Sequence, residues 1–182
     1  LHHPVANCLD YAQLLQEKYR LIECNVVPAF SEESTLDSVS FGCYQLMARY
    51  LQDDKEKIIG LGSGLTLKKA LQRIDFDSLN TRCVALISAM NADGQCNYYD
   101  DVPLLLTRKI KAKYYQWPAP RYAQSADEYE MWCTNRLFRS VSGVAREADV
   151  IFVGIGPLGT QSPIFKDGFI NQAQIGRASC RE

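Results

Sequence analysis

The sequence predicts an α/β fold in which a parallel sheet is covered by helices on both faces. Apolar segments of strand length alternate with segments of helical periodicity along the chain. The strand segments are apolar at consecutive positions, which is typical of parallel strands buried between two helical layers. The 182 residues are 47% apolar and 23% charged, which suits a globular domain with a substantial core.

The first third of the chain is expected to contain a helix, a strand and a second helix. Apolar residues from Val5 to Tyr19 recur at helical spacing and predict an amphipathic helix. Residues 21–27 are rich in β-branched and aliphatic side chains and are followed by Pro28, which predicts a buried strand. A second helix, with Ser34 and Thr35 as candidate N-caps, is expected to end at the polar segment QDDKEK.

The middle of the chain holds two further strands. The first covers residues 57–61 and leads through a glycine turn into a helix over residues 66–74. The second lies within TRCVALISAM and precedes the loop NADGQCNYYD. A helix is then expected over residues 101–113, with Pro103 in its first turn, where a missing N–H group costs little.

The last third is expected to complete the sheet. YYQWPAP predicts a short strand stopped by Pro118 and Pro120, and residues 125–147 predict one or two helices with Ser125 as a cap. DVIFVGIG predicts a fully apolar strand that ends in glycines. The loops after Leu61, Ile87 and Val153 should therefore share the carboxyl edge of the sheet, where parallel sheets bind ligands.

The loop GLGSGLT carries the clearest candidate site. Leu65 stands where a dinucleotide fingerprint has its third glycine, and the P-loop pattern is absent from the sequence. The remaining interpretation is a single phosphate bound by the N–H groups of residues 62–66, with the hydroxyls of Ser63 and Thr66. The alternative is a tight turn in which Thr66 is only an N-cap.

Two other loops at the same edge add candidates. Gly154 and Gly156 form a second glycine loop that would leave room for a ligand. Asn91, Asp93 and Asp100 could bind ligand hydroxyls, or they could only form turns, which is favoured for Asp93 because Gly94 follows it.

Composition argues against several functions. The histidines, His2 and His3, lie far from the glycine loops, so no histidine base is available there. The seven cysteines show no C-x-x-C pair and are expected to be reduced, mostly buried thiols. A net charge of -1 offers no basic surface for nucleic acid, and no stretch has the length of a membrane span. We therefore expect a cytoplasmic protein with no metal, no cofactor and no membrane contact.

Taken together, these segments resemble the effector-binding domain of the SorC family of bacterial sugar-responsive transcriptional regulators. The resemblance covers nearly all of residues 1–174 and rests on the order of several motifs. These are HPVANCLDYAQLLQEKYRLIECNVVP, IIGLGSGLTLKKAL, AKYYQWPAP, and ADVIFVGIG followed by SPIFKDGFI. It implies a Rossmann-like fold similar to that of glucosamine-6-phosphate deaminase and ribose-5-phosphate isomerase.

The resemblance also implies a function and a set of site residues. The ligand would be a sugar or sugar phosphate that acts as a signal, in a protein that forms homo-oligomers. Operator DNA would be bound only through an N-terminal helix-turn-helix domain that is missing before Leu1. Many relatives carry a tryptophan or a basic residue in the first loop, where this chain has Ser63 and Leu65. The residues expected to line the ligand site are Gly62, Ser63, Gly64, Leu65, Thr66, Ser88, Asn91, Gly154 and Gly156.

The sequence leaves two other functions open and suggests where the domain ends. A sugar-phosphate isomerase or deaminase could share the fold, but the deaminase pattern would place an acidic residue and a histidine where this chain has PLGTQ. A nucleotide-binding oxidoreductase shares only the glycines. Residues 1–174 are expected to form a sugar-binding domain truncated at both ends. Residues 175–182, IGRASCRE, are expected to be a foreign tail, or alternatively a genuine polar one.

Overall fold

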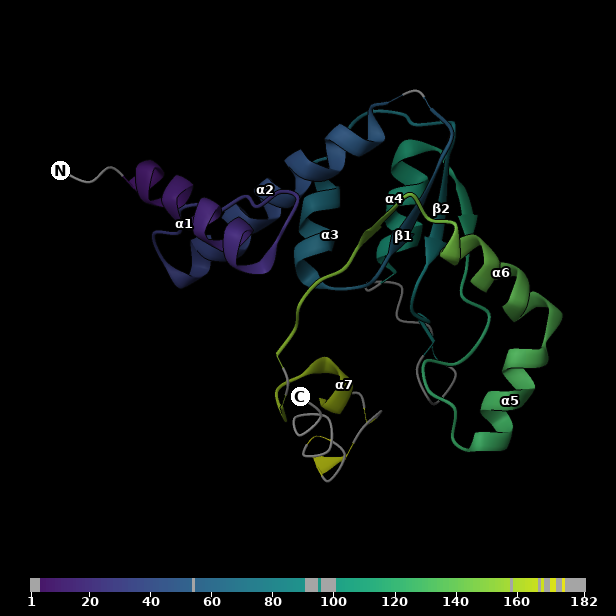
Figure 1. The fold of residues 1–182 in the computed structure, drawn as a ribbon. Coiled ribbons are helices and arrows are strands. Elements are labelled where there is room, and N and C mark those ends of the chain that lie inside the picture. Colours follow the sequence, from purple (N-terminus) through teal and green to yellow (C-terminus); the bar gives the residue numbers. More distant parts are fainter. Residues whose placement is uncertain are drawn as a thin grey trace.

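A four-stranded, fully parallel sheet forms the centre of the molecule (Figure 1). The computed structural model describes residues 4–53, 55–90, 95, 101–157, 159–166, 168, 171–172 and 175. The strand order is β3-β2-β1-β4, which confirms the predicted α/β class with a parallel sheet. The strands are β1 (Lys57–Leu61), β2 (Thr81–Ala85), β3 (Lys113–Tyr115) and β4 (Val150–Phe152).

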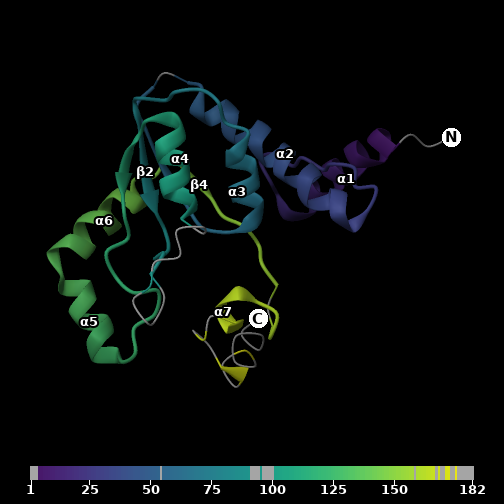
Figure 2. The ribbon, with the colours of Figure 1, turned by 180° about the vertical axis from the view of Figure 1, so that it is seen from behind.

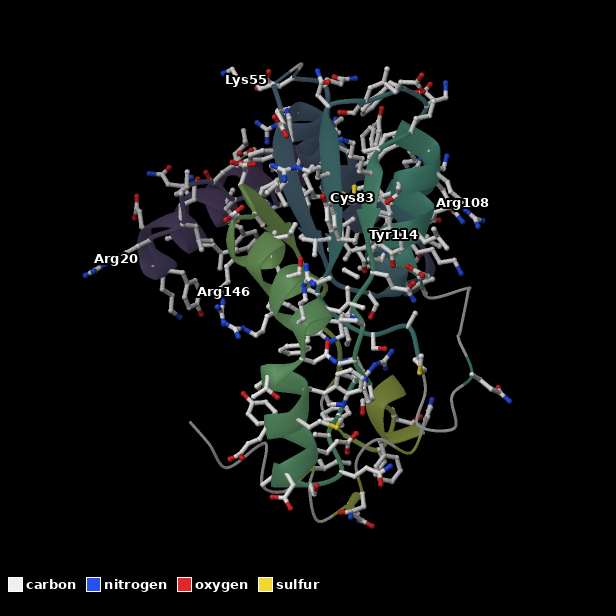
Figure 3. The ribbon with its side chains drawn as sticks, turned by 90° about the vertical axis from the view of Figure 1, so that its right-hand side faces the viewer. Arg20, Lys55, Cys83, Arg108, Tyr114 and Arg146 are labelled. Carbon is white, nitrogen blue, oxygen red and sulfur yellow. The ribbon has the colours of Figure 1, made fainter. Side chains whose placement is uncertain are left out.

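Helices cover both faces of this sheet. The side chains of α2, α3 and α4 pack on one face and those of α6 on the other, and Figure 3 shows α4 and α6 on opposite sides of the strands. Figure 2 shows α1 standing away from the sheet, beyond α2. The helices are α1 (Pro4–Tyr19), α2 (Glu32–Leu51), α3 (Leu65–Gln72), α4 (Val102–Ile110), α5 (Ala126–Thr134), α6 (Arg136–Arg146) and α7 (Pro163–Lys166).

Successive side chains of β1 point to opposite faces of the sheet and so enter two different core clusters. Ile59 and Leu61 of β1 face α2, α3 and α4, while Ile58 faces α6. The larger cluster includes Met47, Leu71 and other fully buried side chains, each worth about 1.5–3 kcal/mol when removed from water. This packing fixes β1 at the centre of the sheet and so fixes the loop that follows it.

The strand predicted over residues 21–27 is wrong. This segment is an irregular connection between α1 and α2, and Ile22 is fully exposed. β-Branched composition alone does not make a strand, because a strand also needs a hydrogen-bonding neighbour. In this structure the segment instead approaches α2, where a Cβ at Gly42 would lie 3.0 Å from Val27 Cγ1.

Three smaller expectations also need correction. The N-cap of α2 is Ser31 rather than Ser34 or Thr35, because Ser31 and Ser34 form a reciprocal capping box. β2 ends at Ala85, before the predicted Leu86 and Ile87. The last strand is neither long nor fully buried, since β4 forms a sheet edge and exposes Ile151.

The cysteines and the C-terminal residues are described only in part. The described cysteines Cys8, Cys24, Cys43, Cys83 and Cys133 are free thiols, but only Cys83 is buried, so the expected burial of most thiols is wrong for this part of the chain. Cys96, Cys180 and most of the expected tail 175–182 lie outside the described residues. Across the described ranges, no helix combines the length and apolar character needed to cross a membrane.

Tyr114 should make the fold sensitive to alkali. Burial, together with the nearby Asp101 carboxylate, raises the pKa of Tyr114 above its ordinary value near 10. The unfolded chain then loses this proton at lower pH than the folded chain does, so stability is intact below about pH 10 and declines above it. Urea unfolding at pH 8 and pH 11 should show this decline. The decline should be shallower in Tyr114→Phe, and an equal decline in both proteins would contradict the assignment.

Candidate functional site

The sheet has a topological switch point between β1 and β4. The chain runs outward from β1 through β2 to β3 and then returns to place β4 on the other side of β1. Parallel α/β sheets bind ligands outside the carboxyl ends of the strands at such a point. The loops after β1 and β4 therefore flank the candidate site, as the sequence predicts.

Helix α3 begins at this point without a side-chain cap. The first turns of α2, α4, α5 and α6 are capped by the side chains of Ser31, Asp101, Ser125 and Asn135. The cap residue of α3 is Gly64, which has no side chain to offer. Thr66 is therefore not the N-cap, contrary to that detail of the tight-turn alternative.

The first N–H groups of α3 have no partner within the helix. The first helical bond runs from the Lys68 N–H to the Gly64 carbonyl at 3.0 Å, so the N–H groups of Leu65 and Thr66 have no helical partner. Gly64 has φ 133° and ψ 155°, and a Cβ placed there would meet no atom within 4 Å. An open helix terminus of this kind attracts anions through its N–H groups and its dipole.

The other glycines of the first loop have different positions. The Gly62 N–H donates to the Phe152 carbonyl at 2.9 Å, which extends the hydrogen bonding between β1 and β4. This N–H group is therefore not available to a ligand. Gly60 lies within β1, where a Cβ would come within 3.0 Å of Ile151 Cγ1. Gly60 therefore serves packing, while Gly62 brings the two flanking loops together.

The loop after β4 lies directly against the first loop. A Cβ at Gly154 would be 3.5 Å from the Ser63 carbonyl oxygen, whereas a Cβ at Gly156 would meet nothing within 4 Å. The structure thus brings Gly154 against the first loop, close to Gly62, while the surroundings of Gly156 are open. Leu65 is exposed on the first turn of α3.

The loop after β2 joins the same edge. The Leu86 N–H donates to the Leu61 carbonyl at 2.9 Å, which ties this loop to the end of β1. Ser88 is buried, and its hydroxyl accepts from the Met90 N–H at 3.1 Å. Asn91, like Asp93 and Asp100, lies outside the described residues.

Arg121 is a residue that the sequence reasoning missed. Its guanidinium donates to the Ser88 carbonyl through Nε at 3.3 Å and Nη2 at 3.0 Å. The available signal was its position six residues after β3, because whatever follows a parallel strand emerges at the carboxyl edge. Arg121 places a cation beside the second loop.

Among the described residues, the structure offers no metal-binding cluster, and Lys69 of α3 is already paired. The charge of Lys69 on α3 is satisfied by Asp37 at 2.7 Å, and this hydrogen bond and charge hold the pKa of the Asp37 carboxyl below its usual value. Within the described part of the chain, no group of three or more His, Cys, Asp or Glu residues could hold a metal ion. The arrangement is suited to binding an anion.

Comparison with known proteins identifies the family. The model of the Sugar-bind family, a sugar-binding domain, matches residues 3–180. The chain belongs to the Sugar-bind family. This Sugar-bind domain is 26% identical over 175 residues to the erythritol catabolism regulatory protein EryD of Brucella abortus, a match that covers 94% of the chain and 54% of EryD. It therefore spans about half the length of that curated relative.

Solved structures show the same fold. The Sugar-bind domain superposes on a DeoR family transcriptional regulator from Listeria monocytogenes with a TM-score of 0.79 at 22% identity, covering 95% of this chain and 68% of the other. It superposes on the full-length sorbitol operon regulator SorC from Klebsiella pneumoniae with a TM-score of 0.78 at 18% identity, covering 100% and 60%. The resemblance to SorC-type regulators found in the sequence is confirmed.

Proposed function

We propose that this chain is the effector-binding domain of a bacterial DNA-binding transcriptional regulator that senses a sugar or sugar phosphate in the cytoplasm and controls carbohydrate-metabolism genes. The Sugar-bind family and a curated relative that regulates erythritol catabolism support this proposal. The remaining half of such a regulator would supply the operator-binding helix-turn-helix domain.

The observation that carries the proposal is the uncapped start of α3 at the switch point. The phosphate of the effector would accept from the N–H groups of Leu65 and Thr66 and from the hydroxyls of Ser63 and Thr66. Gly64 would allow the close approach, and the sugar would lie against Ser88, Asn91 and the third loop. The proposed ligand-binding residues are those expected from the sequence: Ser63, Gly64, Leu65, Thr66, Ser88, Asn91, Gly154 and Gly156. Gly62, also expected there, would support the loop through its bond to Phe152 rather than bind the phosphate.

A homo-oligomer is part of the same proposal. Helix α1 leaves large apolar side chains in solvent, among them Leu9, Tyr11 and Leu14. Exposed apolar side chains of this size on a helix suit contact with a second copy of the chain. An effector could then act by binding one arrangement of the copies more tightly than another.

A thermal-shift experiment tests the proposal. The chain is screened against sugars and their phosphates at equal ionic strength. A ligand present at about 100 times its Kd adds about 2.7 kcal/mol to the free energy of unfolding. For a chain of this size, that raises Tm by about 5–10 °C. At least one sugar or sugar phosphate should reach this shift, with a phosphate exceeding its neutral parent sugar. A panel in which no compound moves Tm would contradict the proposal.

The enzyme alternative is tested with the same compounds. We expect no isomerisation or deamination, because the described site holds neither a histidine nor a paired set of carboxylates. Product formation at a rate that scales with chain concentration would overturn this expectation. A sugar phosphate that raises Tm and is recovered unchanged would support the sensor.

A further inference from the structure

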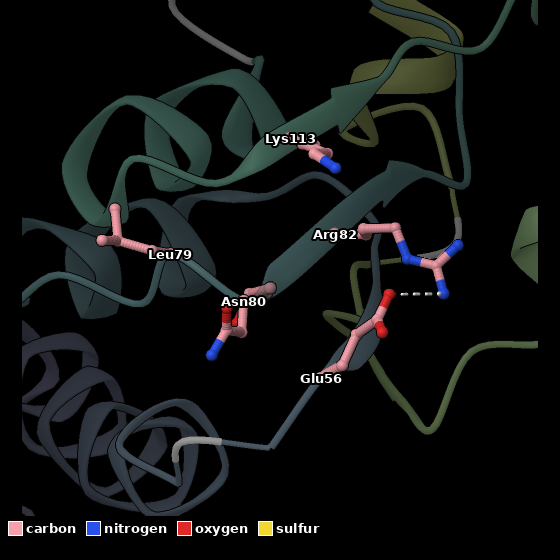
Figure 4. Close-up of a pocket in the computed structure, with 6 residues that line it drawn as sticks. Glu56, Leu79, Asn80, Arg82 and Lys113 are labelled. Carbon is pink, nitrogen blue, oxygen red and sulfur yellow. Dashed lines mark ion pairs between the residues drawn. The ribbon is translucent and has the colours of Figure 1, made fainter.

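A hollow lies at the edge of the sheet opposite to the one that carries the proposed effector site. It measures about 230 Å³ and is formed where β1, β2 and β3 begin (Figure 4). Its lining is mostly polar or charged, and it is separated from the α3 terminus by the length of the strands. The lining residues are Glu56, Leu79, Asn80, Thr81, Arg82 and Lys113.

Two positively charged side chains line this hollow. Arg82 and Lys113 are register partners on the neighbouring parallel strands β2 and β3. Register partners point to the same face with about 4.8 Å between strands, and like charges in such positions are unfavourable unless an anion offsets them. Figure 4 shows both side chains extending to the same side of their strands.

The protein supplies only part of the compensation. Glu56 Oε1 lies 3.3 Å from Arg82 Nη2, and Glu56 itself is 72% exposed. One carboxylate against two cations leaves one positive charge in excess. Among the described residues, no carboxylate lies within ion-pair distance of the Lys113 ammonium.

A buried donor points to the missing partner. Arg82 Nε is buried and has no hydrogen-bond partner within the described chain. A buried guanidinium N–H without an acceptor is unfavourable, and an oxyanion is the acceptor that matches its planar donor geometry. Both the excess charge and the unused donor would be satisfied by one anionic group.

We propose that this hollow binds the oxyanion group of a small molecule, a phosphate or a carboxylate, between Arg82 and Lys113. The oxyanion accepts from Arg82 Nε and from the Lys113 ammonium, and Thr81 and Asn80 form the polar wall beside it. This site is independent of the effector site, since it shares no residue with it. The chain would then hold one anion at each edge of the sheet.

Titration with inorganic phosphate, and separately with acetate, tests this site. Backbone amide shifts of ¹⁵N-labelled chain are followed at ionic strength held constant with sodium chloride. Saturable shifts are expected at Thr81, Arg82 and Lys113 with at least one of the two anions. Comparison of the two titrations shows whether the site prefers phosphate or carboxylate. Absence of a saturable shift at these amides with both anions would overturn the proposal.

Variants separate this site from the effector site. Lys113→Gln keeps the Arg82–Glu56 pair. It should lower the affinity for the anion by at least about tenfold, because it removes a charge-assisted hydrogen bond. Lys18→Gln, which removes an exposed lysine on α1, should leave affinity unchanged. Gly64→Val should also leave it unchanged, even though it disables the effector site. Equal affinity in wild type and Lys113→Gln would contradict the proposal.

Discussion

Replacing Gly64 by valine is expected to weaken sugar-phosphate binding by at least about a hundredfold. Gly64 has φ 133° and ψ 155°, a region that essentially only glycine adopts, and it opens the first turn of α3. A valine there would rotate the turn and place a branched side chain in front of the open N–H groups. Two charge-assisted hydrogen bonds would be lost, which accounts for the hundredfold. Calorimetric titration with the ligand that gives the largest thermal shift measures the effect.

The matched control is Gly143→Val. Gly143 lies in α6, and a Cβ there would meet nothing within 4 Å, so the same side chain is added without a clash. Binding should be unchanged, and stability should rise by a few tenths of a kcal/mol because valine is a better helix former. Gly64→Val should stay folded, at a cost of about 1–3 kcal/mol for the strained backbone. A folded Gly64→Val protein that binds normally would exclude the loop as the phosphate site.

Replacing Asp101 by alanine is expected to lower the free energy of unfolding by about 2–4 kcal/mol. The buried Asp101 carboxylate caps α4 by accepting from the Leu104 N–H at 2.9 Å, and it also accepts from the Tyr114 hydroxyl at 3.2 Å. Losing an N-cap costs about 1 kcal/mol, and leaving a part-buried hydroxyl unpaired adds about 1–3 kcal/mol. Urea denaturation followed by circular dichroism measures the change.

A double-mutant cycle isolates the Asp101–Tyr114 contact. Asp101→Ala, Tyr114→Phe and the double variant should show a coupling of about 1 kcal/mol or more, because each single change breaks the same hydrogen bond. Asp101→Asn retains a side-chain oxygen for the Leu104 N–H and should cost less than Asp101→Ala. Additive effects of the two single variants would show that the hydrogen bond contributes nothing.

The sequence predicted the order of the elements well because the core enforces it. Strand β1 is apolar on both faces and lies at the centre of the sheet, so its pattern reports its environment directly. Residues 21–27 have a similar composition but lack a neighbouring strand, and a local pattern cannot reveal whether such a neighbour exists. β4 was predicted too long for the same reason, since its exposure depends on its place at the edge.

The candidate site was predictable only in part. Glycines before a helix indicated the first loop, and parallel strands required the loops to share one edge. The engagement of the Gly62 amide with Phe152 and the packing role of Gly60 depend on how β1 and β4 pair, which the glycine pattern does not encode. Arg121 reaches Ser88 across 33 positions of sequence, a long-range contact with no local signal.

The most direct test of the account is a crystal structure of this chain with the sugar or sugar phosphate that gives the largest thermal shift. We expect the phosphate oxygens of the bound ligand to lie within about 3 Å of the backbone N atoms of Leu65 and Thr66. The sugar should lie beside Gly154 and Ser88. A ligand bound elsewhere, with the first turn of α3 facing only solvent, would contradict it.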